Sequence, residues 1–267
     1  MPFVTAADGC RLHYTLHGPA DAPALLIGYP WNDGMAALLS ADPSLGQTEE
    51  EMIAANRAVV AGFAERYRVV QMDYPRGMAP SDPPREGDLT ADTVASDYLA
   101  FADAAGVERF VTVGFSWSAN AALQVASRTE RCAGVAVGGW PPLSAPYEAL
   151  LELTRAPLPM LEAGDPQGSF LNSIANYYAS IVGHWDEEKE VARLTGPRIA
   201  FVGSEDRGVP GSGLSVDLAG PTIERRAELE ALGWEVVIFD GLDHMQAGND
   251  ADLIVRTVRA TLDKHTW

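Results

Sequence analysis

The sequence predicts an α/β protein in which a mostly parallel β-sheet is covered by helices on both faces. Short, continuously apolar segments alternate along the chain with longer segments whose apolar residues recur at helical spacing. Strands that are apolar throughout are typical of a parallel sheet, because helices cover both of its faces and leave neither to solvent. The 267 residues are enough for one large domain of this class. One segment, residues 140–195, interrupts the alternation and predicts an insert.

Seven segments have the composition of strands. Residues 10–17 alternate between apolar and polar side chains, which favours a half-buried strand at an edge of the sheet. The other six are short apolar runs, several of which end on glycine, and they favour central strands: 23–28, 69–73, 110–114, 133–138, 198–203 and 234–239.

The segments between these strands carry helical patterns. We predict a helix between Thr90 and Gly106, because threonine is a typical N-cap residue and glycine typically ends a helix. Residues 117–127 are rich in alanine, which favours a helix directly after a strand. Helical spacing also predicts helices over residues 49–65 and 224–232, and a last helix that starts at Asn249.

The insert at residues 140–195 has the composition of a lid. Prolines and a glycine mark its borders, at Pro141-Pro142 and Gly196-Pro197. Its patterns are helical, and aromatic side chains are frequent in it. We therefore expect a core domain made of residues 1–139 and 196–267, and a helical cap at residues 140–195 that covers a site.

Composition argues against several classes of function. A net charge of −18 disfavours a nucleic-acid partner, whose phosphates require Lys and Arg. We find no signal peptide and no apolar run long enough to cross a bilayer, which predicts a cytosolic protein without a membrane partner. Cys10 and Cys132 are too few for a disulfide framework. No metal-ligand spacing and no Gly-rich phosphate loop occurs, so we expect neither a metal nor a cofactor. The expected partner is a small-molecule substrate, and a homo-oligomer remains open.

Ser116 stands where a strand, a sharp turn and a helix are predicted to meet. The sequence from Gly114 to Ser118 follows the G-x-S-x-G pattern of a nucleophile elbow, with Ser118 in place of the second glycine. The turn requires small residues two positions before and after the serine, and both positions meet this requirement. It also directs the backbone N–H of Trp117, at the positive end of the next helix, toward the space beside Ser116. Ser118 is a second candidate nucleophile, but Asn120 would then occupy a position that requires a small residue.

An acid and a base follow Ser116 in the order expected of a catalytic triad in this arrangement. A serine hydroxyl becomes a nucleophile only when a base takes its proton, and the base needs an acid to set its tautomer. Asp206 follows the strand predicted over residues 198–203, with Glu205 beside it as the alternative acid. His244 follows the last predicted strand. We predict Ser116 as the nucleophile, His244 as the base and Asp206 as its partner.

On these residues the chain resembles the α/β-hydrolase superfamily, in the serine-nucleophile branch with a helical cap. Residues 25–30 are similar to the family's oxyanion segment, with Ile27 in place of the usual histidine. Residues 76–81 resemble its R-G-x-G-x-S turn, and residues 241–244 resemble its histidine loop. The resemblance implies an eight-stranded, mostly parallel sheet with the cap inserted after the sixth strand. It also implies that the backbone N–H groups of Tyr29 and Trp117 hold the oxyanion.

The resemblance and the aromatic insert together predict a serine hydrolase for a small or medium, mostly apolar ester, lactone or thioester. Residues 31–47 follow the oxyanion segment and either line the pocket or form a surface loop. The candidate pocket residues are Trp31, Trp140, Tyr177 and Trp185. The same triad serves cofactor-free C–C hydrolases, lyases, cyclases and peroxidases, and the same pocket occurs in hydrolase-derived receptors. These functions remain alternatives, because a fold does not by itself establish a function.

Overall fold

A computed structural model describes most of the chain. The described residues are 2–28, 30–34, 36, 40, 47–85, 89–161, 166–209 and 215–267. Tyr29, one of the two predicted oxyanion residues, lies outside them.

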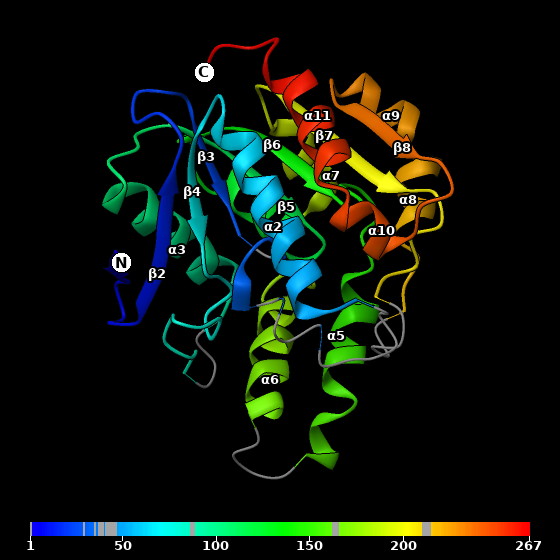
Figure 1. The fold of residues 1–267 in the computed structure, drawn as a ribbon. Helices are drawn as coiled ribbons and strands as arrows, with labels where there is room; N and C mark the ends of the chain where they lie inside the picture. The colour runs from blue at the N-terminus through cyan, green and yellow to red at the C-terminus, as the bar shows by residue number, and fades with distance from the viewer. Residues whose placement is uncertain are drawn as a thin grey trace.

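Eight strands of the described chain form one sheet in the order β1-β2-β4-β3-β5-β6-β7-β8 (Figure 1). The strands β1 and β2 run antiparallel to their neighbours, and all the other pairs are parallel. Their bounds are β1 (Phe3–Thr5), β2 (Arg11–His17), β3 (Ala24–Ile27), β4 (Arg68–Met72), β5 (Phe110–Phe115), β6 (Cys132–Gly138), β7 (Arg198–Gly203) and β8 (Glu235–Phe239). The predicted α/β-hydrolase fold with a mostly parallel eight-stranded sheet is therefore confirmed.

Helices cover both faces of this sheet. On one face α2 (Glu49–Ala64) packs against α11 (Ala251–Leu262), and their apolar side chains form one core with those of the central strands. On the other face α3 (Ala91–Ala104) packs against α4 (Trp117–Ala126) over a second core. The central strand β5 is buried along its whole length because it lies between these two cores.

The described residues of the segment between β6 and β7 form helices and contain no strand. It consists of α5 (Tyr147–Arg155), the short 3-10 helix η2 (Leu158–Met160), α6 (Pro166–Ala179) and α7 (Glu187–Arg193). The helices α5 and α6 pack against each other and extend away from the sheet (Figure 1).

Three local predictions differ from the structure. The seven segments with strand composition do not include β1, because its three residues carry no pattern of their own and the strand exists through pairing with β2. The helix predicted over residues 224–232 is the shorter α9 (Arg226–Ala231), and the sequence pattern missed α8 (Ala219–Glu224), which Arg225 separates from it. Asn249 does not start the last helix: it ends α10 (His244–Asn249), and Asp250 caps α11 by accepting the N–H of Leu253 at 2.9 Å.

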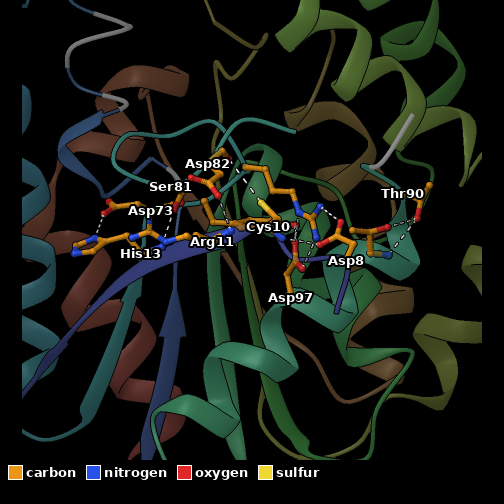
Figure 2. Close-up of polar contacts among 12 residues, drawn as sticks. Asp8, Cys10, Arg11, His13, Asp73, Ser81, Asp82, Thr90 and Asp97 are labelled. Carbon is orange, nitrogen blue, oxygen red and sulfur yellow. Dashed lines mark hydrogen bonds and ion pairs between the residues drawn. The ribbon is translucent and has the colours of Figure 1, made fainter. Parts of the chain in front are cut away.

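The turn after β4 is held by a network of hydrogen bonds and ion pairs (Figure 2). Arg76 is buried and donates through Nε and Nη2 to the two carboxylate oxygens of Asp97, at 2.7 and 2.8 Å. Its third nitrogen, Nη1, donates to Asp8. A buried guanidinium requires such partners, because an unpaired charge in the interior is strongly destabilising. At the other end of the turn Ser81 accepts the backbone N–H of His13 at 2.8 Å, and so ties the turn to β2.

No helix in the described residues is both long and apolar enough to span a bilayer.

Candidate active site

Ser116 lies at a sharp turn between β5 and α4. Its backbone has φ 58° and ψ −125°, a strained conformation for a residue with a side chain. The turn brings the chain so close to itself that a Cβ on Gly114 would lie 2.2 Å from the carbonyl oxygen of Ser118. The position two residues before the serine therefore has no room for a side chain and must be a glycine, as the elbow pattern predicts.

The hydroxyl of Ser118 holds this turn from inside. It accepts the backbone N–H of Phe115 at 2.9 Å and donates to the carbonyl of the same residue at 3.1 Å. Ser118 is 1% exposed, whereas Ser116 is only half-buried. Of the two candidate nucleophiles, Ser116 is thus the one open to a substrate.

Asp206 and His244 form a buried pair. The Nδ1 atom of His244 lies 2.9 and 2.8 Å from the two carboxylate oxygens of Asp206. The carboxylate also accepts the backbone N–H of Gly208 at 3.0 Å, which fixes its orientation. A carboxylate on Nδ1 holds the proton on that nitrogen and leaves Nε2 as the basic atom. Glu205, the alternative acid, has an exposed side chain, so the structure brings Asp206 and not Glu205 to the histidine.

His244 also lies beside the turn that carries Ser116, which we call the serine turn. Its ring centroid is 4.9 Å from that of Phe115, the residue before Ser116. The three predicted triad residues follow the carboxyl ends of β5, β7 and β8, which lie at one edge of the sheet. Ligands of open parallel sheets bind at this edge.

Trp117 is the first residue of α4, so its backbone N–H belongs to the helix N-terminus. Its indole packs between Tyr74, at 6.1 Å between ring centroids, and Tyr177 of α6, at 5.1 Å. The first turn of α4 is therefore in contact with the insert.

Three of the four predicted pocket residues join an aromatic series on the insert side of the sheet. From Trp117 the series passes to Tyr177 and Tyr178, whose rings are 5.6 Å apart. It continues through Trp140, Tyr147 and Trp185, with neighbouring centroids 6.4, 5.6 and 5.9 Å apart. Burial raises the pKa of Tyr177 well above its usual range, so its phenol stays protonated and can donate a hydrogen bond.

Trp31, the fourth predicted pocket residue, lies elsewhere. It is fully buried in the core under α2 and α11, where its ring centroid is 6.4 Å from that of Phe115. Its indole Nε1 donates to the carbonyl of Gly248 at 3.2 Å. The structure thus separates Trp31 from the aromatic series and places it behind the helix that carries His244.

Sequence reasoning missed the helix α10, which begins at His244. Asp243 accepts the N–H of Gln246 at 2.8 Å, and the Gln246 side chain accepts the N–H of Asp243 at 3.0 Å. This is a capping box, and its spacing of an acid followed three residues later by glutamine is present in the sequence. The pattern could have predicted a helix instead of a loop.

The described residues contain no group of three or more His, Cys, Asp or Glu side chains arranged to hold a metal ion.

A sequence profile for the alpha/beta hydrolase fold matches residues 49–218, more than half of the 267-residue chain. A search among curated proteins found no significant match. Among solved structures, an enol-lactonase from Burkholderia xenovorans LB400 is similar with 18% identity and a TM-score of 0.63, over 98% of this chain and 100% of that one. A thermophilic esterase from Thermogutta terrifontis has 17% identity and a TM-score of 0.65, over 99% of both chains.

A further similar structure is that of an epoxide hydrolase of this superfamily from metagenomes of hot environments. It has 19% identity and a TM-score of 0.63, over 99% of this chain and 98% of that one. At such sequence identities the structural similarity shows the fold alone. The strand order of the sheet, the sharp turn at Ser116 and the match to the sequence profile agree with this fold. The chain belongs to the α/β-hydrolase fold family.

Proposed function

We propose that the protein is a serine hydrolase that cleaves a small or medium, mostly apolar ester, lactone or thioester through an acyl-enzyme on Ser116. The observation that carries this proposal is the buried Asp206–His244 pair beside the strained turn that presents Ser116. A nucleophile, a base and an acid that orients the base are the groups needed for acyl transfer.

In the proposed mechanism Nε2 of His244 takes the proton of Ser116 Oγ as the oxygen attacks the carbonyl carbon. The Asp206 carboxylate stabilises the imidazolium that forms. The N–H of Trp117 receives the negative charge of the tetrahedral oxygen, and Tyr29 is the proposed second donor. Each such donor contributes about 3 kcal/mol to the stability of the transition state. The imidazolium then protonates the leaving group, and His244 activates water to release the acid.

The helical insert supports the proposed substrate class. Its aromatic series reaches Trp117, the residue after Ser116, and we propose that an acyl group on Ser116 lies close to these rings. We propose that residues 140–195 act as a lid over the site. The names of two similar structures, a lactonase and an esterase, agree with an ester or lactone substrate.

The proposal is tested with Ser116→Ala and a fluorophosphonate probe. We expect the variant to keep its thermal unfolding temperature and to lose turnover of a chromogenic ester by at least about a thousand-fold. In the unsubstituted protein, peptide mapping should find the label on Ser116. A label on Ser118, or ester turnover near the original rate in the variant, would overturn the assignment of the nucleophile.

A panel of esters, lactones and thioesters then tests the substrate class. Covalent labelling of Ser116 without turnover of any acyl substrate would exclude acyl hydrolysis. That result would favour the alternative functions that the same triad allows, namely C–C bond hydrolysis, a lyase reaction or ligand reception.

A further inference from the structure

The helix that carries His244 is too short to hold itself in place. The helix α10 has six residues. Isolated helices of this length do not form in water, because nucleation costs more than the few hydrogen bonds return. Contacts with the rest of the molecule must therefore set the position of α10 and, with it, of the imidazole.

One such contact comes from Trp31. Its indole N–H donates to the carbonyl of Gly248, near the end of α10, at 3.2 Å. The last carbonyl groups of a helix have no hydrogen-bond donor within the helix, and the indole N–H is the donor for one of them. Trp31 is fully buried, which gives its ring little freedom to move.

The same helix end is in close contact with Phe115. A Cβ on Gly248 would lie 2.7 Å from the ring of Phe115, so only a glycine allows this approach. The Phe115 ring also contacts His244, at the first residue of α10. The Phe115 ring therefore packs against both Trp31 and α10, and Phe115 directly precedes Ser116 in the chain.

A second contact comes from Gln47. The side-chain amide of Asn249 donates to Oε1 of Gln47 at 2.6 Å. Trp31 and Gln47 stand at the two ends of the segment 31–47, which follows the predicted oxyanion segment in the sequence. The last two residues of α10 are therefore each hydrogen-bonded to one of these two side chains.

We propose that Trp31 and Gln47 are positioning residues for His244: they hold the end of α10 and so keep the imidazole aligned with Asp206 and Ser116. This inference rests on the proposed function, because it assigns the imidazole the role of the base. It gives Trp31 a role in aligning the base, in place of the pocket-lining role expected for it.

The test compares Trp31→Phe with Trp234→Phe. The first change removes the indole N–H that donates to the Gly248 carbonyl of α10, and phenylalanine keeps an aromatic ring in the core. The second removes a buried indole N–H that has no hydrogen-bond partner among the described residues. Trp234 directly precedes β8, at the end of the strand opposite to His244, and its variant is the matched control. Both variants are first checked for cooperative thermal unfolding.

We expect Trp31→Phe to lower kcat for a chromogenic ester by about five-fold, the effect of losing one hydrogen bond, and to leave KM unchanged. The low-field proton NMR signal of His244 Nδ1–H, which reports its bond to Asp206, should broaden or move. Trp234→Phe should change neither kcat nor this signal. Gln47→Met, which removes the acceptor on the second contact, should lower kcat by about two-fold and shift the same signal.

The proposal is overturned if the His244 signal and kcat in both Trp31→Phe and Gln47→Met equal those of Trp234→Phe. Gln47 is only partly buried, so Gln47→Met keeps the test valid even if Trp31→Phe does not fold. The NMR signal reports the His244–Asp206 bond whether or not the protein turns over esters. Failure of the proposed function, shown by Ser116→Ala, is therefore distinguishable from failure of this inference.

Discussion

At the scale of single residues, the serine turn shows how a departure from a family pattern is compensated. Ser118 stands where the elbow pattern has a second glycine, and its side chain is buried in the turn. There its hydroxyl bonds both the N–H and the carbonyl of Phe115. The strained backbone of Ser116 is thus held in place by the residue that replaces the glycine.

We expect Ser118→Ala to lower the free energy of unfolding by about 1–3 kcal/mol, because a buried backbone N–H loses its acceptor. Denaturant unfolding measures the change. Ser127→Ala is the control, because that hydroxyl is only half-buried at the end of α4, and it should cost less. Equal losses in the two variants would show that the Ser118 hydroxyl does not hold the turn.

At the scale of elements, α2 illustrates a boundary that is encoded locally. Thr48 accepts the N–H of Glu51 at 3.2 Å, and the Glu51 carboxylate accepts the N–H of Thr48 at 2.8 Å. Three acidic residues occupy the first turn, where the helix dipole favours negative charge. The helix begins at Glu49, as the sequence predicts, because its start depends only on neighbouring residues.

We expect Thr48→Ala to lower the free energy of unfolding by about 1 kcal/mol, the usual loss for an N-cap threonine. The loss should appear in the global transition, because α2 packs against α11 across the core. Thr48→Ser keeps the hydroxyl and should restore most of the stability. If the serine variant were as unstable as the alanine variant, the cap would not be the cause.

At the scale of the whole molecule, the two ends of the insert are joined to each other. The side chain of Glu187, on α7, accepts the backbone N–H groups of Ser144 at 2.5 Å and of Ala145 at 3.3 Å. Arg225, between α8 and α9, donates to Ser144 Oγ at 3.0 Å and pairs with Glu188. These contacts tie the start of the insert to its end and to the core.

Burial raises the pKa of Glu187 from its ordinary value of 4.5 to about 7. A raised pKa in the folded state means that the folded protein binds the proton more tightly than the unfolded chain. The resulting stabilisation is complete below pH 4.5 and is lost as the pH rises toward about 7.

We therefore expect the unfolding temperature of the original protein to fall, relative to that of Glu187→Gln, between pH 4.5 and about pH 7. Glutamine has a similar shape but does not titrate, so the difference between the two curves isolates this carboxyl group. A difference that stays constant across the interval would contradict the raised pKa.

Much of the fold and part of the candidate site could be predicted because the signals are local. Runs of apolar residues mark the central strands, since parallel strands are buried on both faces. The elbow at Ser116 is recognisable because the small residues it requires are its sequence neighbours. Asp206 and His244 follow strands that could be located in the same way.

The sequence by itself thus determined the sheet, the helices on its two faces and the candidate triad in its chain order. Only the tertiary structure decided which of two adjacent acids reaches His244, and that Trp31 supports α10 behind the site. Both outcomes depend on the direction of a side chain and on its distance to a segment far away in the chain. Local patterns do not encode such distances, because packing between elements sets them after the elements have formed.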